Sequence, residues 1–176
     1  MAVSRAAVVR VLALAAVVPV VAVLIAPGIA LIIHREGSAG ISGYSQPLAA
    51  VVERTWRDAT PQPLRFIGGD GELAYGTAFY LARPATVFPD NNRQLAPWVD
   101  ASELALAGIV LVCPASEEHC IARSKGYAGN FPRFGVDEVT LAKRYLGVEG
   151  PRRNFVIVTV PPRNALASAS ARRADQ

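Results

Sequence analysis

The sequence is poor in the residues that most enzymes and metal sites use for chemistry. Its 176 residues include 2 His, 2 Cys and 1 Met, and aromatic residues make up 7% of the chain. It has no Gly-x-Ser-x-Gly segment, so the nucleophile elbow of an α/β-hydrolase is excluded. The spacing of the histidines and cysteines matches no zinc motif. We therefore assign no catalytic residue and expect neither a metal nor a cofactor.

The sequence also lacks a long run of charge of one sign. Its 18 Lys and Arg against 14 acidic residues give a formal net charge of +4. No stripe of basic residues alternates with aromatic ones, so we expect no nucleic-acid partner. Asp137 and Glu138 are neighbours in a predicted strand and would point to opposite faces, which does not suit a shared acid/base pair.

A long apolar segment near the N-terminus is the most prominent feature that the sequence does have. Residues 11–33 carry no charge, and as a helix they would extend roughly 34 Å, enough to cross a hydrocarbon core of about 30 Å. Arg5 and Arg10 precede this segment without a nearby acid, whereas Arg35 is followed by Glu36. The positive-inside rule then predicts a cytoplasmic stub at residues 1–10.

Two questions about this segment stay open. A cleaved signal peptide is an alternative to an uncleaved anchor, although the apolar stretch is long for one, and in both cases the rest of the chain is exported. Pro19 and Pro27 would kink a membrane helix, which neighbouring helices tolerate best, and several alanines would allow close helix packing. Other transmembrane helices are therefore candidate partners besides the lipid bilayer, but an Ala-rich composition explains the alanines equally well.

Beyond the span we predict one α/β domain. Residues 34–44, rich in Gly and Ser, should be a linker, residues 45–163 the domain, and residues 164–176 a disordered tail. Helices are predicted at residues 46–58, 70–80, 100–107 and 116–125, the last one N-capped by Ser116. Strands are predicted at residues 64–67, 85–88, 108–113, 136–145 and 154–160, the last two forming an antiparallel hairpin around residues 147–151. The alternation predicts a small three-layer domain with a mixed sheet.

One segment has the spacing of a dinucleotide-binding motif. Residues 69–74 (Gly-Asp-Gly-Glu-Leu-Ala) follow a predicted strand and open a helix, and Asp90 comes about 20 residues later. However, Asp70 and Glu72 place negative charge where a pyrophosphate needs donors. We therefore interpret the segment as a helix-capping turn.

The cysteines and the aromatic residues supply the remaining candidates. Cys113 ends an apolar strand and Cys120 lies in the following helix, a geometry that fits either a disulfide or two separate thiols. Tyr75, Tyr80 and Trp98 are candidate contacts for a sugar or an acceptor, because the apolar faces of sugars stack on aromatic rings. We expect Phe79 on the inner side of its helix instead.

The order of several segments resembles a known family. The segments are residues 30–35 (Ala-Leu-Ile-Ile-His-Arg), 52–56 (Val-Glu-Arg-Thr-Trp), 64–69 (Leu-Arg-Phe-Ile-Gly-Gly), 75–80 (Tyr-Gly-Thr-Ala-Phe-Tyr), Pro97-Trp98, 108–113 (Gly-Ile-Val-Leu-Val-Cys) and 155–163 (Phe-Val-Ile-Val-Thr-Val-Pro-Pro-Arg). They resemble the last transmembrane helix and periplasmic domain of bacterial family 39 glycosyltransferases, relatives of the protein mannosyltransferases and of the aminoarabinose transferases.

This resemblance implies a location and a context. In that family a body of many membrane helices transfers a sugar from a polyprenyl-phosphate donor, and the catalytic acid lies in the first extracytoplasmic loop. Nothing in this chain corresponds to that loop. We therefore expect a single-pass protein of the bacterial inner membrane, with its C-terminal domain in the periplasm, that is not catalytic alone and is either a fragment or a split subunit of such an enzyme. The alternative is a free-standing periplasmic binding or interaction module without enzymatic activity.

Overall fold

A computed structural model describes residues 5–36 and 40–163 of the chain. Its contacts divide the chain into two units. The first contains the N-terminal helix and the outer end of the last hairpin, residues 144–151, and the second contains the α/β domain. Residues 1–4 of the predicted stub and the whole predicted tail, residues 164–176, lie outside the described part.

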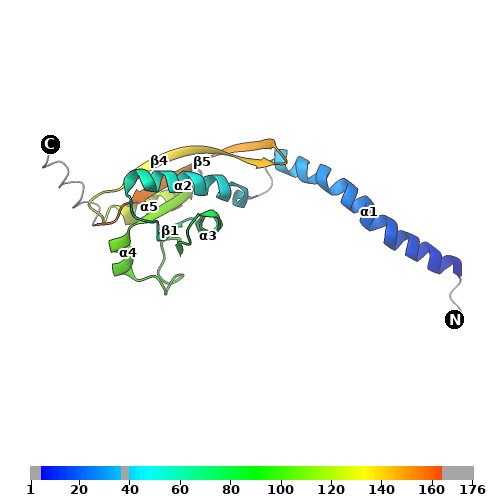
Figure 1. The fold of residues 1–176 in the computed structure, drawn as a ribbon, viewed down its shortest axis with the longest axis horizontal. Coiled ribbons are helices and arrows are strands. Elements are labelled where there is room, and N and C mark those ends of the chain that lie inside the picture. The colour runs from blue at the N-terminus through cyan, green and yellow to red at the C-terminus, as the bar shows by residue number, and fades with distance from the viewer. Residues whose placement is uncertain (1–4, 37–39, 164–176) are drawn as a thin grey trace. The chain divides into compact units, whose positions relative to one another are not determined.

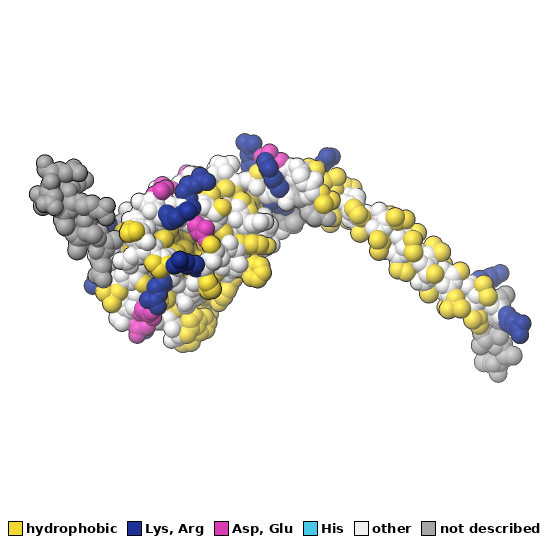
Figure 2. Space-filling model, viewed as in Figure 1, with side chains coloured by type: hydrophobic (Ala, Val, Ile, Leu, Met, Phe, Trp, Pro, Cys, Tyr) yellow, Lys and Arg dark blue, Asp and Glu magenta, His cyan; other side chains and the backbone are white. Residues whose placement is uncertain are grey.

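The N-terminal unit is dominated by one long helix, α1 (Arg5–Glu36), which includes the predicted span. Its segment Val8–Glu36 is long and apolar enough to cross a membrane, with a mean hydropathy of 2.8. Its side chains are exposed along almost the whole helix, and Figure 2 shows them as a continuous apolar surface with basic groups at both ends. Pro19 and Pro27 lie inside the helix. In water such a surface would be unfavourable, so α1 has the character of a membrane helix.

The α/β domain alternates strands and helices as predicted. Its elements are η1 (Ile41–Tyr44), α2 (Ser45–Ala59), β1 (Phe66–Gly69), α3 (Gly71–Tyr80), β2 (Thr86–Pro89), α4 (Ala101–Ala107), β3 (Ile109–Pro114), α5 (Glu118–Ala128), β4 (Gly135–Tyr145) and β5 (Val148–Val160). Figure 1 shows β4 and β5 as a long hairpin. The outer end of this hairpin belongs to the N-terminal unit.

The five strands form one mixed sheet in the order β2-β1-β3-β5-β4. β1 pairs in parallel with both β2 and β3, and β5 runs antiparallel to β3. Every residue of β3 is buried, as its uninterrupted apolar sequence predicted. Because side chains alternate along a strand, Val110 and Val112 face one side of the sheet, whereas Ile109 and Leu111 face the other.

Each face of the sheet has its own hydrophobic core. Residues of η1, α2 and α3, among them Tyr44, Leu48, Trp56 and Leu73, pack against one face. Residues that precede α4, and α4 and α5 themselves, cover the other, through Ala96, Val99, Leu104 and Ala128. The domain therefore has the predicted helix–sheet–helix layers, and the mixed α/β fold class is confirmed.

Of the two helix caps that the sequence predicts, the one at Asp70 is confirmed and the one at Ser116 is wrong, and the structure adds a third cap at Asp100. Asp70 Oδ1 accepts a hydrogen bond from Leu73 N at 2.9 Å and caps α3. Asp100 caps α4, and the hydroxyl of Ser102, together with backbone N–H groups of the first turn, lowers the pKa of this carboxyl. The predicted Ser116 cap is wrong: α5 begins two residues later, behind Glu117, and no side chain caps it.

Three further predictions differ from the structure. Phe79 does not lie on the inner side of α3 but is 79% exposed. The hairpin turn consists of Leu146 and Gly147, and β5 begins at Val148 and includes Pro151. β3 pairs with β5 from Phe155 onward, so Pro151 lies before the segment of β5 that pairs with β3. Tyr44, placed in the predicted linker, is fully buried in the core.

Gly69 provides a test of the central packing. Its φ is +99°, and a Cβ there would overlap the backbone of Val112 on β3. We expect Gly69→Ala to lower the free energy of unfolding by about 3 kcal/mol or more, because both the conformation and the space exclude a side chain. The measurement is denaturant unfolding of the detergent-solubilised chain, followed by tryptophan fluorescence.

Gly126→Ala is the matched control, since nothing lies within 4 Å of a Cβ at this position in α5. It should be neutral or stabilise by up to about 1 kcal/mol, because alanine is the better helix former. Equal effects of the two substitutions would contradict the close approach of β1 and β3.

Candidate functional site

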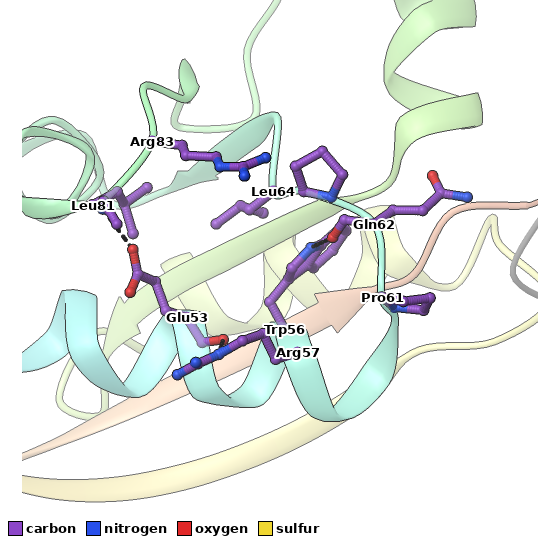
Figure 3. Close-up of a pocket in the computed structure, with 10 residues that line it drawn as sticks. Glu53, Trp56, Arg57, Pro61, Gln62, Leu64, Leu81 and Arg83 are labelled. Atoms are coloured by element: carbon purple, nitrogen blue, oxygen red, sulfur yellow. Dashed lines mark hydrogen bonds between the residues drawn. The ribbon is translucent and has the colours of Figure 1, made fainter.

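A largely apolar cavity of the domain opens between the C-terminal end of α2 and the loops that follow α2 and α3. It has a volume of about 320 Å³. Figure 3 shows the side chains of Glu53, Trp56 and Arg57 on α2, with Leu64 and Arg83 facing them from the two loops. The other lining residues are Pro61, Gln62, Pro63, Leu81 and Ala82. We call this cavity the α2–α3 pocket, and its size and lining are typical of a site for a small organic ligand.

A few hydrogen bonds hold the walls of the α2–α3 pocket in place. The indole Nε1 of Trp56 donates to the carbonyl of Gln62 at 2.7 Å, which ties the loop after α2 to the helix. Glu53 Oε1 accepts a bond from Ala82 N at 2.6 Å and ties the loop after α3 to the same helix. Trp56 itself is buried and forms the floor. The pocket is thus built from fixed walls, although it is open to solvent.

The charges of the pocket are mainly positive. The guanidinium groups of Arg57 and Arg83 both line it and are exposed. Arg57 uses its Nε to donate to the carbonyl of Glu53 at 3.2 Å, which leaves its terminal nitrogens available to a ligand. The carboxylate of Glu53 already accepts the N–H of Ala82. This arrangement favours an anionic group that is joined to an apolar body.

Sequence reasoning did not find this pocket. Arg57 ends one helix and Arg83 follows another, so they are far apart in the chain and belong to no motif. Only the packing of α2 and α3 side by side on one face of the sheet brings them together.

A second, smaller cavity lies at the carboxyl ends of the parallel strands, and we call it the switch-point crevice. It has a volume of about 120 Å³ and is lined by Gly69, Asp70, Asp90, Asn91, Glu117, His119, Cys120 and Arg123. The connections that leave β1 and β3 go to opposite faces of the sheet here, which is where open α/β sheets commonly bind ligands.

The crevice holds two consecutive non-glycine residues with left-handed backbone, Asp90 at φ 52° and Asn91 at φ 51°. Asn91 fixes the turn, because its Oδ1 accepts from Gly69 N and its Nδ2 donates to Ser124 Oγ, both at 3.1 Å. Arg123 donates to the carbonyl of Asp90 at 2.9 Å. These bonds join the ends of β1 and β2 to α5, which explains why the turn adopts this uncommon conformation.

The crevice does not suit a dinucleotide. Asp70 is occupied with capping α3, as the interpretation of residues 69–74 as a capping turn requires. Asp70, Asp90 and Glu117 bring three carboxylates to the cavity, against the single guanidinium of Arg123. A pyrophosphate would meet repulsion at the end of α3 instead of donors.

The two cysteines are joined by a disulfide beside this crevice, with their Cα atoms 5.8 Å apart. Cys113 is buried at the end of β3, and its Sγ lies 3.4 Å from Ser124 Oγ. Cys120 is half-buried in the first turn of α5. The bond attaches the start of α5 to the central strand.

The three aromatic candidates are all exposed, two of them on α3 and one in the loop before α4. Tyr75 and Tyr80 are about half exposed on α3, and the ring of Phe79 packs edge-on against Tyr80. Trp98 is exposed in the loop before α4. Its neighbours Ala96 and Val99 pack on the face of the sheet opposite to α3.

The two histidines have different settings. His119 is exposed at the rim of the switch-point crevice. His34 is buried in the last turn of α1, where its Nε2 donates to the carbonyl of Val148 at 3.0 Å. Within the described residues no group of three or more His, Cys, Asp or Glu side chains is arranged to hold a metal ion.

Comparison with known proteins gives no match: no family model fits this chain, and no curated protein or solved structure is significantly similar to it. The function therefore has to be argued from the sequence and the geometry of the two cavities.

The disulfide gives the prediction for this part of the domain. In the entropic model, closing so short a loop lowers the conformational entropy of the unfolded chain and stabilises the folded state by about 2–3 kcal/mol. Reduction with a dithiol should therefore lower the free energy of unfolding by that amount, measured by denaturant unfolding with and without reductant.

The control is a variant that combines Cys113→Ala and Cys120→Ala, whose stability should be the same in both conditions. A wild-type chain equally stable with and without reductant would show that the bond contributes nothing to folding.

Proposed function

We propose that this protein is a membrane-anchored, extracytoplasmic binding domain that works beside a polyprenyl-phosphate-sugar glycosyltransferase and does not catalyse transfer by itself. Helix α1 would span a bacterial inner membrane with its N-terminus in the cytoplasm. The observation that carries the proposal is the α2–α3 pocket, in which two guanidinium groups lie beside an apolar wall.

The charges and the lining of the pocket suggest its ligand. Arg57 and Arg83 would bind a phosphate through paired N–H donors, and Leu64 and Leu81 would contact the first apolar groups attached to it. A membrane-anchored domain meets such molecules as lipid-linked phosphates.

The same residues argue against catalysis in the pocket. Among the side chains that line it, Glu53 is the one carboxylate, and it is hydrogen-bonded to the loop after α3. No histidine, cysteine or serine lines the pocket to act as a base or nucleophile. The pocket can hold and orient a ligand, and the transfer step would belong to a partner that supplies the catalytic acid.

A free-standing binding module is the second candidate, and the same pocket favours it. The two candidates differ in whether α1 has helical partners. Pro19 and Pro27 in α1 are better tolerated beside other membrane helices, and this favours the proposal of a partner enzyme.

The ligand of the pocket can be tested with farnesyl phosphate as the probe and farnesol as its uncharged match. We expect the detergent-solubilised chain to bind farnesyl phosphate at least about tenfold more tightly than farnesol, since two charge-assisted contacts contribute. Arg83→Ala and Arg57→Ala should each remove most of this preference in titration calorimetry.

Arg133→Ala is the matched control, because Arg133 is exposed in the loop before β4 and does not line the pocket. If all three variants bind the phosphate like wild type, the pocket is not its site.

The absence of catalysis is tested by incubating the purified chain, in vesicles, with a polyprenyl-phosphate-linked sugar and measuring release or transfer of the sugar. We expect a rate equal to the protein-free background, because the one carboxylate at the pocket, Glu53, is hydrogen-bonded to the loop after α3. Sustained turnover by the chain alone would contradict the proposal, while a genuine transferase added to the same vesicles shows that the donor is competent.

A further inference from the structure

We propose that the turn between β4 and β5 inserts into the lipid interface beside the end of α1, with Leu146 as the inserted side chain. This inference rests on the membrane anchoring in the proposed function, but not on the ligand of the α2–α3 pocket. Three observations in the N-terminal unit support it.

The first observation is the position of the turn. Residues 144–151 belong to the same compact unit as α1. The carbonyl of Val148, directly after the turn, accepts a hydrogen bond from Nε2 of His34 at 3.0 Å. His34 is followed by Arg35 and Glu36, the first charged residues after the apolar run. This is where a membrane helix leaves the hydrocarbon core, so the turn lies at the depth of the interface.

The second observation is the backbone of the turn. Leu146 has φ 48° and Gly147 has φ 80°. Positive φ at both central residues is the geometry of a type I′ hairpin turn, in which Asn or Asp normally precedes Gly. Leucine adopts left-handed backbone at a cost and offers the turn no hydrogen bond in return. A side chain that is unfavourable for the turn points to a contact outside the hairpin.

The third observation is exposure. The side chain of Leu146 is 76% exposed, more than almost any other large apolar side chain outside α1. Packing of the Leu146 side chain within the protein therefore does not offset the energetic cost of its left-handed backbone. Arg144, two positions earlier on β4, is also exposed. An apolar tip with a basic residue behind it matches an interface of acyl chains below anionic headgroups.

The test uses the full chain in vesicles of phosphatidylcholine and phosphatidylglycerol. Because Cys113 and Cys120 are bonded to each other, a cysteine introduced by Leu146→Cys is the one free thiol and can carry an NBD fluorophore. Lipids with a nitroxide close to the headgroup should quench this probe at least about threefold more than a probe at Glu138→Cys, further back on β4. Iodide in the water should quench the two probes in the opposite order.

The outcomes separate this inference from the anchoring itself. A probe at Val21→Cys, in the apolar middle of α1, should be quenched by lipids with a deep nitroxide. If this probe is not quenched, the proposal that α1 anchors the protein in the membrane is wrong. If it is quenched while the probes at Leu146 and Glu138 respond equally, the inserted turn is wrong. Protection of the Leu146 probe from iodide without quenching by nitroxide lipids would mean that protein covers the turn, and would also overturn the inference.

A second variant removes the lipid contact while keeping the hairpin. Asparagine suits left-handed backbone better than leucine, so Leu146→Asn should leave the turn folded. With the NBD group now on Arg144→Cys, we expect Leu146→Asn to lower quenching by shallow nitroxide lipids at least about twofold. Leu146→Met, which keeps an apolar tip, should restore it. Equal quenching with leucine, asparagine and methionine at this position would overturn the proposal.

Discussion

The burial of β3 on both faces is the constraint on which the rest of the domain depends. All residues from Ile109 to Pro114 are buried, so each side of this strand needs a covering layer. α2 and α3 cover one side, and α4 and α5 cover the other. The strand also sets the sheet directions, since β1 joins it in parallel and β5 antiparallel. The close approach at Gly69 and the disulfide at Cys113 both follow from its central position.

The α2–α3 pocket and the switch-point crevice arise from different consequences of this layering. The switch-point crevice lies where the connections after β1 and β3 separate to opposite faces, and its carboxylates, its Asn91 bridge and its disulfide mainly join elements together. The α2–α3 pocket lies where two helices end on the same face of the sheet. Its arginines contribute little to the packing of the domain. Polar groups that are not needed for folding are the better candidates for binding, and the proposed function therefore rests on the α2–α3 pocket.

Local signals in the sequence were reliable where a single segment decides its own structure. The apolar run, the buried strand at β3 and the Asp70 cap depend on neighbouring residues alone. Predictions were wrong where contacts with other segments decide the structure of a segment. The cap predicted at Ser116 is absent because α5 begins two residues later. Phe79 is apolar like a core residue, but the buried side of α3 is formed by Leu73, Ala74 and Thr77, and Phe79 is exposed to solvent. Pro151 lies in β5, before the segment that pairs with β3.

The sequence by itself determined that this protein has an apolar helix long enough for a membrane and a mixed α/β body, because both follow from patterns of burial along the chain. It did not determine the site. Arg57 and Arg83 line one pocket because two helices pack side by side, and the turn that carries Leu146 lies at the end of α1 through the contact of Val148 with His34. Such meetings depend on the angles and lengths of packed elements, which no local pattern of residues encodes.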